Sequence, residues 1–186
     1  MSAAKVKKFM ELAGQETAAK VHFGTPETRK LGAQLLLSEV LEYVIRGLGV
    51  TPVIDGVRIS DPESLRYEVE DQSPDKLEMI DGLADVAYTM HWNAHAFGVP
   101  LEESFDLVCD NNLGKFVELA HWSGGEGDLP KSEWHCSAGV VWPPEVVRVE
   151  VLEVGGEFFA VGKDSRGKVR KPSTYKPVDL THLVVE

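Results

Sequence analysis

Two stretches are the most informative part of this sequence: Glu78-Met79-Ile80-Asp81-Gly82-Leu83-Ala84-Asp85 and the earlier Ser38-Glu39-Val40-Leu41-Glu42. In both, carboxylates recur at three- or four-residue spacing, which places them on one face of a helix. Each cluster stands beside apolar residues, where a carboxylate without a partner is costly. Five such groups can stay ionised together if a cation compensates them, and all-oxygen ligands select a hard ion such as Mg²⁺. We therefore expect two acidic helices that bind magnesium, or manganese, for chemistry on a phosphorylated compound.

Each acidic cluster also has a simpler interpretation as a solvated helix face. Glu42 is followed four residues later by Arg46, which is the spacing of a helical ion pair. Gly82 shares the face of the second cluster, and a glycine there costs helix stability. Close packing or the approach of a ligand would explain it. The residues alone leave both interpretations open.

Apolar residues at helical spacing predict four helices. The two long ones carry the acidic clusters, and each has a proline in its expected first turn, where proline is well tolerated. Glycine or proline follows the second long helix and ends it. The predicted helices cover residues 4–13, 26–48, 74–97 and 101–116.

Two segments alternate around turn residues and predict β-hairpins, at 50–59 around Asp55-Gly56 and at 146–161 around Gly155-Gly156. The polar segment 61–74 is loop-like, with a helical turn at 63–67 as an alternative. Residues 163–176 carry six cations against a single anion, Asp164. The sequence therefore predicts a mainly α fold with a β-hairpin and a basic tail.

The composition narrows the class of protein. A net charge of -11 over 186 residues argues against binding DNA, RNA or an anionic membrane. Cys109 and Cys136 form no CxxC pair, which gives no disulfide framework and fits a reducing cytoplasm. No apolar run approaches the ~20 residues that cross a membrane. We expect a cytoplasmic protein whose ligand is a small molecule.

Two further segments complete a recognisable order of motifs. Asn112-Leu-Gly-Lys115-Phe ends the last predicted helix, and Gly167-Lys168-Val-Arg170-Lys171-Pro172-x-x-Tyr175-x-Pro177 lies in the tail. With Ser38-Glu39-x-x-Glu42 and Glu78-x-x-Asp81-Gly-Leu-Ala-Asp85, this order resembles the all-α nucleoside triphosphate pyrophosphohydrolases, the MazG-like superfamily. Within that superfamily the chain is most similar to the phosphoribosyl-ATP pyrophosphohydrolase-like branch. The resemblance covers residues 4–49, 74–117 and 160–182.

The resemblance implies a helical bundle of the all-α NTP pyrophosphatase type. It divides the chain into a helical catalytic core at 1–117, a β-rich insertion at 118–162 and a basic tail at 163–186 that packs on the core. The implied reaction hydrolyses a nucleotide between its α- and β-phosphates to a monophosphate and pyrophosphate. Magnesium would neutralise the triphosphate and lower the pKa of a bound water.

The resemblance also implies roles for particular residues. As metal ligands it points to Glu39, Glu42, Glu78, Asp81 and Asp85, and as catalytic residues to Glu39, Glu78 and Lys115. Glu78 would act as ligand or as the base that takes the water's proton, and Lys115 would stabilise charge on phosphate oxygens. The residues implied for substrate binding are Asn112, Lys115, Lys168, Lys171 and Tyr175.

The sequence and the resemblance allow alternatives for the ligands, the oligomer, the substrate and the function. The principal pair on the second acidic helix is either Glu78/Asp81 or Asp81/Asp85. Ser38 stands where the family usually has its first glutamate, so that ligand is absent or replaced by a hydroxyl or a water. Family members form dimers or tetramers, and we expect a homodimer or homotetramer here. Substrate candidates are deoxyuridine, deoxycytidine or damaged purine triphosphates, or phosphoribosyl-ATP. The alternative function is a non-catalytic helical oligomerisation or nucleotide-binding module.

Overall fold

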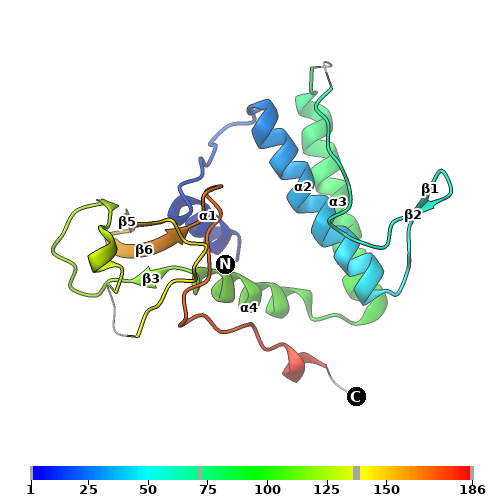
Figure 1. The fold of residues 1–186 in the computed structure, drawn as a ribbon. Coiled ribbons are helices and arrows are strands. Elements are labelled where there is room, and N and C mark those ends of the chain that lie inside the picture. Colours follow the sequence, from blue (N-terminus) through cyan, green and yellow to red (C-terminus); the bar gives the residue numbers. More distant parts are fainter. Residues whose placement is uncertain (1, 71–72, 136–138, 185–186) are drawn as a thin grey trace. The chain divides into compact units, whose positions relative to one another are not determined.

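The fold mixes helices with two antiparallel sheets (Figure 1). The computed structural model describes residues 2–70, 73–135 and 139–184, so Cys136 and the end of the 61–74 loop lie outside the described residues. The helices are α1 (Ser2–Leu12), α2 (Pro26–Glu42), η1 (Tyr43–Gly47, a π-helix), α3 (Lys76–Phe97), α4 (Leu101–Leu113), η2 (Lys131–Glu133) and η3 (Thr181–Leu183). The strands are β1 (Val53–Ile54), β2 (Val57–Arg58), β3 (Val117–Glu118), β4 (Gly127–Asp128), β5 (Arg148–Val154) and β6 (Glu157–Lys163).

The expectation of a mainly α helical bundle is wrong, because the chain is a mixed α/β protein. The predicted helices at 4–13, 26–48, 74–97 and 101–116 are present, and so are both hairpins. The helical turn considered at 63–67 is absent from that described segment. The difference lies in the hairpin at 146–161, which is not an addition to a helical bundle. Its strands instead form the centre of a four-stranded sheet, and both clusters of buried apolar residues include side chains from these strands.

The chain divides into two compact units. The first unit comprises Met1–Thr17 and Tyr88–Glu186, and the second comprises Ala18–Ala87. Helix α3 begins in the second unit and ends in the first. These units are defined by packing. The division into catalytic core, insertion and tail at residues 117 and 162 concerns function and stays a prediction.

The first unit is built around a sheet with the strand order β3-β6-β5-β4, and all neighbours are antiparallel. Its central hairpin pairs Arg148 with Lys163 and Val154 with Glu157. Gly155 and Gly156, at the turn, have φ values of 68° and 85°. A two-residue turn with positive φ at both positions matches the twist of the two strands. The outer strands β3 and β4 each contribute two residues.

Both faces of this sheet are covered. On one face, Val149, Val151 and Ala160 pack with Trp142 and other residues of the 139–146 segment. On the other face, Phe159 and Val161 pack with Leu12 of α1 and with Phe116, which follows α4. Alternating residues of β5 and β6 therefore point to two different apolar layers, as a sheet buried on both sides requires.

Trp142 lies directly against the backbone of β6. A Cβ atom added at Gly162 would come within 2.4 Å of the Trp142 ring. Any side chain at position 162 would therefore displace the indole, so glycine is required by packing rather than by backbone conformation. This contact joins the 139–146 segment to the sheet.

The second unit contains α2, η1, the β1–β2 hairpin and most of α3. Thr25 caps α2 by accepting a hydrogen bond from the Thr28 amide, and Pro26 stands in the first turn as expected. Helix α3 begins at Lys76 because the Asp75 carboxylate accepts hydrogen bonds from the Leu77 and Glu78 amides. The hairpin turns at Asp55 and Gly56, both with positive φ.

The two long helices bury almost none of their apolar side chains. Helix α2 has no buried residue, and in α3 only Ala94, which belongs to the first unit, is buried. Leu35 is 55% exposed and Leu83 is 64% exposed. In the described part of the chain, no helix has the length and apolar character needed to cross a membrane.

Candidate functional site

The five predicted carboxylates all lie in the second unit. Glu39 and Glu42 stand near the end of α2, and Glu78, Asp81 and Asp85 lie along the first half of α3. All five side chains are exposed. The structure therefore places each acid on the element that the sequence predicted, with access to solvent.

On α3 the acids face away from an apolar groove. This groove has a volume of about 640 Å³ and lies between the segment 18–22 and Met79, Ile80, Leu83 and Ala84 of the helix. At 3.6 residues per turn, these four apolar positions lie on the side of the helix opposite to Glu78, Asp81 and Asp85. The ammonium of Lys76 lies 5.1 Å from the centre of the Phe23 ring, which extends the contact between the segment 18–22 and α3 by one residue. The segment at 18–23 thus covers part of the apolar face and leaves the acidic face open.

One of the two acids on α2, Glu42, has a partner in η1, the π-helix that directly follows α2. The Glu42 carboxylate accepts a hydrogen bond from Nη1 of Arg46, the ion pair that the i, i+4 spacing suggested. The hydroxyl of Ser38 donates to the Leu35 carbonyl at 3.2 Å. Arg46 thus supplies a local counter-charge for Glu42.

The acids offer oxygen ligands suitable for Mg²⁺, and among the described residues they do not gather into a coordination site. Carboxylate oxygens are the ligands that hard divalent cations prefer. Within the residues that the structure describes, no three His, Cys, Asp or Glu side chains gather closely enough to hold a metal ion. A Cβ atom at Gly82, on the acidic face of α3, would also have no neighbour within 4 Å. Packing inside the chain therefore does not explain this glycine.

The predicted substrate-binding residues lie in the first unit, at the end of α4 and in the tail. Asn112 is in the last turn of α4, and its Oδ1 accepts a hydrogen bond of 2.6 Å from Nζ of Lys115. The same ammonium lies 5.4 Å from the centre of the Phe9 ring. The i, i+3 spacing of Asn112 and Lys115 thus produces a direct contact.

The tail is attached to the end of α4. The Tyr175 hydroxyl donates to Oδ1 of Asn111, and Nδ2 of Asn111 donates to the Lys176 carbonyl at 2.6 Å. Lys171 places its ammonium 4.6 Å from the centre of the Tyr175 ring. The structure therefore brings Tyr175 and Lys171 to the helix end that carries Asn112. Asn111, which forms the attachment, was not among the predicted residues.

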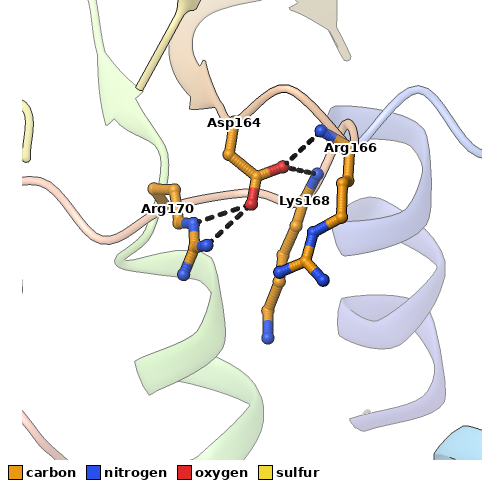
Figure 2. A network of polar contacts seen from close by, with 4 residues as sticks. All are labelled: Asp164, Arg166, Lys168 and Arg170. Carbon is orange, nitrogen blue, oxygen red and sulfur yellow. Dashed lines mark hydrogen bonds and ion pairs between the residues drawn. The ribbon is translucent and has the colours of Figure 1, made fainter. Parts of the chain in front are cut away.

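A buried carboxylate organises the start of the basic segment (Figure 2). Oδ1 of Asp164 accepts hydrogen bonds from the amides of Arg166 and Lys168, both at 2.9 Å. Oδ2 accepts two more from Nε and Nη2 of Arg170, at 3.1 and 2.7 Å. Burial alone would raise the pKa of this carboxyl, but the two amides and the guanidinium together hold its pKa below the ordinary value.

In the sequence Asp164 stands out only as the lone anion among cations, and this structural role is not among the predictions. A signal was available in the order Asp164-Ser165-Arg166-Gly167. An aspartate followed three residues later by glycine is typical of a turn in which the carboxylate accepts backbone hydrogen bonds.

Comparisons with protein-family models, with curated proteins and with solved structures find no match to this chain.

Proposed function

We propose that this protein is a magnesium-dependent nucleotide pyrophosphohydrolase that cleaves a nucleoside triphosphate between its α- and β-phosphates. The proposal rests chiefly on the order of the motifs: an acidic pair, a second acidic cluster, an Asn-x-x-Lys segment and a basic tail. The placement of the first two on the long helices of one unit, with open acidic side chains, supports it. The contact between Asn112 and Lys115 supports a role for the third. We place the protein in the cytoplasm.

The proposed roles follow the chemistry of each side chain. Glu39, Glu42, Asp81 and Asp85 supply oxygen ligands, and Glu78 serves as a further ligand or as the general base. Lys115 stabilises charge that develops on phosphate oxygens. Asn112, Lys168, Lys171 and Tyr175 bind the substrate. Manganese would replace magnesium, because it also prefers oxygen ligands.

The reaction is tested with a panel of nucleoside triphosphates in the presence of Mg²⁺, in an assay free of added pyrophosphatase. Pyrophosphate is the expected product, because the motifs resemble those of α–β cleaving enzymes and the sequence has no P-loop. The panel includes phosphoribosyl-ATP, deoxyuridine and deoxycytidine triphosphates and damaged purine triphosphates. Release of orthophosphate as the first product would contradict the proposed bond cleavage.

Metal binding is tested apart from turnover by calorimetry with Mg²⁺ and Mn²⁺. Glu42→Gln and Asp85→Asn are expected to lose binding while retaining the fold, since each removes one charged ligand. Glu118→Gln is a matched control, because Glu118 is an exposed glutamate of β3 in the other unit. Equal affinities for the metal in the unmodified chain and in all three variants would refute the assignment of Glu42 and Asp85 as ligands.

We also propose that the protein is a homodimer or homotetramer. Apolar side chains on α2 and α3 are exposed, which favours an interface between copies. They include Leu31, Leu35, Leu36, Leu37, Val40, Leu77, Met79, Ile80 and Leu83. Light scattering is expected to give at least twice 20.5 kDa at micromolar concentration. A mass near that of one chain would refute the oligomer.

The second candidate function is a helical oligomerisation or nucleotide-binding module without catalysis. The Glu42–Arg46 ion pair favours it, because it gives the glutamate a structural partner. For such a module we expect oligomers or nucleotide binding, and no release of pyrophosphate from any member of the panel.

A further inference from the structure

The loop that joins β6 to the tail has a defined conformation. The Asp164 amide donates to the Lys168 carbonyl at 3.1 Å, and the Gly167 amide donates to the Asp164 carbonyl at 2.9 Å. Gly167 has a φ of 78°. A turn followed by a glycine with positive φ is a common way to close a short hairpin. The Arg170 amide then donates to the Gly162 carbonyl at 2.8 Å, which continues the pairing past the loop.

Asp164 holds the backbone of this loop rather than the charges at its tip. Its side chain is 5% exposed. Its carboxylate oxygens accept hydrogen bonds from the amides of Arg166 and Lys168 and from the guanidinium of Arg170. The carboxylate therefore binds two backbone amides and one arginine side chain, and it does not bind the side chains of Arg166 and Lys168. The side chains of Arg166 and Lys168 project from the fixed loop, and Figure 2 shows them extending in the same direction.

The charges in this segment are not all balanced locally. Lys163 is buried and forms an ion pair with Glu150, and Arg170 is paired with Asp164. For Arg166 and Lys168, no carboxylate of the described residues lies within ion-pair distance. Both side chains are exposed. An acidic protein of net charge -11 thus presents two exposed cations that form no ion pair with the described part of the chain.

The loop lies close to the end of α4. Val169, which stands between Lys168 and Arg170, packs with the apolar cluster that contains Phe116 and Leu113. Those two residues flank Lys115, a proposed phosphate contact. The loop and the helix end are therefore parts of one packed region of the first unit.

We propose that the loop 164–168 is a binding site for a phosphate chain, in which Arg166 and Lys168 contact the phosphates and Asp164 is the positioning residue. A guanidinium matches two phosphate oxygens at once, and an ammonium adds a point charge. A backbone held in advance reduces the entropy that binding would otherwise cost. The identification of the phosphate chain as that of a nucleotide rests on the proposed function, but binding of a phosphate chain does not.

The test measures binding of inorganic tripolyphosphate by calorimetry at low salt and without divalent metal, so that hydrolysis plays no part. Arg166→Gln and Lys168→Gln are each expected to weaken binding by about tenfold, the loss typical of a charge-assisted hydrogen bond. Lys176→Gln is the matched control, because it removes one exposed cation from the same tail, and it is expected to change the affinity less than twofold. Equal losses in all three variants would show a general charge effect and overturn the proposal. Orthophosphate is expected to bind more weakly than the chain.

Asp164→Asn distinguishes positioning from simple electrostatics. Removing a negative charge beside an anion site strengthens anion binding if the loop keeps its shape regardless of Asp164. Positioning predicts the opposite sign, a weaker binding of tripolyphosphate in a variant whose circular dichroism is unchanged. Stronger binding would overturn the positioning role. If this variant does not fold, the comparison of Arg166→Gln, Lys168→Gln and Lys176→Gln still decides the site.

Turnover separates this proposal from the proposed function. Tripolyphosphate binding without nucleotide hydrolysis would refute the enzyme and support the loop. Hydrolysis with an unchanged KM in both Arg166→Gln and Lys168→Gln would support the enzyme and refute the loop.

Discussion

Leu12 of α1 and Leu83 of α3 are both helical leucines, yet the first is 1% exposed and the second is 64% exposed. Helix α1 has 11 residues and packs against the sheet of the first unit. Helix α3 has 22 residues, and the groove on its apolar side is open. The comparison teaches that a helix gains stability from the surface it packs against more than from its length.

The two units differ in the burial of their apolar side chains, as these two leucines do. Among the described residues, both clusters of buried apolar side chains belong to the first unit, and they include Val149, Val151, Ala160 and Val161. The second unit has capped helices and a well-formed hairpin turn but exposed leucines. Local signals are thus present in both units, whereas a packed core is present in one. The proposed oligomer would supply the second unit with a packing surface from another copy.

The largest effect is expected from a matched pair of leucine substitutions. Leu12→Ala removes a buried side chain and is expected to lower the free energy of unfolding by about 2–5 kcal/mol. Leu83→Ala is expected to change it by less than about 0.5 kcal/mol at a concentration where the chain is monomeric. Urea denaturation followed by circular dichroism measures both. Equal losses would mean that α3 is buried by a partner under those conditions.

A smaller loss is expected where the sheet meets Trp142. Gly162→Ala introduces a Cβ into the indole and is expected to cost about 1–3 kcal/mol, the usual range for overpacking. Gly125→Ala is the control, since a Cβ at Gly125 would have no neighbour within 4 Å. A neutral Gly162→Ala would show that the 139–146 segment moves aside easily.

In the second unit a glycine substitution is expected to have the opposite sign. Gly82→Ala should stabilise α3 by about 0.5–1 kcal/mol, because alanine favours a helix and nothing lies within 4 Å of the added Cβ. Thermal unfolding at low concentration measures the gain. A loss instead of a gain would indicate that the acidic face of α3 is closely approached, by a ligand or by a second copy.

The smallest effect is expected in the dependence of stability on acidic pH, to which the titration of Asp164 contributes. Its pKa lies below the ordinary value of about 3.9, so the unfolded chain takes up this proton more readily than the folded one. The stability that it contributes is complete above about pH 5 and is lost as the pH falls through the native pKa. The acid profile of Asp164→Asn should therefore be flatter than that of the unmodified chain. Identical profiles below about pH 4 would contradict the shift.

The features predicted correctly from the sequence depend on neighbouring residues. Thr25 and Pro26 mark the start of α2, and Asp55-Gly56 marks the turn of the small hairpin. Strands β3 and β4 were missed because each has two residues and exists only through pairing with β6 and β5. A two-residue strand has no alternation to detect. The sheet, and with it the mixed class of the fold, was therefore underestimated.

The candidate site shows the same limit. Helical spacing placed the acids of α2 and α3 on the correct elements, and it also suggested the Glu42–Arg46 pair. It did not show that Asn111 would join Tyr175 to α4, because these residues are 64 positions apart. Contacts between distant segments depend on the whole fold, so spacing along one helix does not show which side chains converge.

The packing of Trp142 against Gly162 has a consequence for spectroscopy. All four tryptophans of the chain, at positions 92, 122, 134 and 142, belong to the first unit. Trp142 is 9% exposed and Trp92 is 58% exposed, so the emission spectrum combines a blue-shifted and a red-shifted component. Indole fluorescence follows the melting of the first unit only. Far-ultraviolet dichroism also follows α2 and α3, so a mismatch between the two signals would reveal a second unit that melts separately.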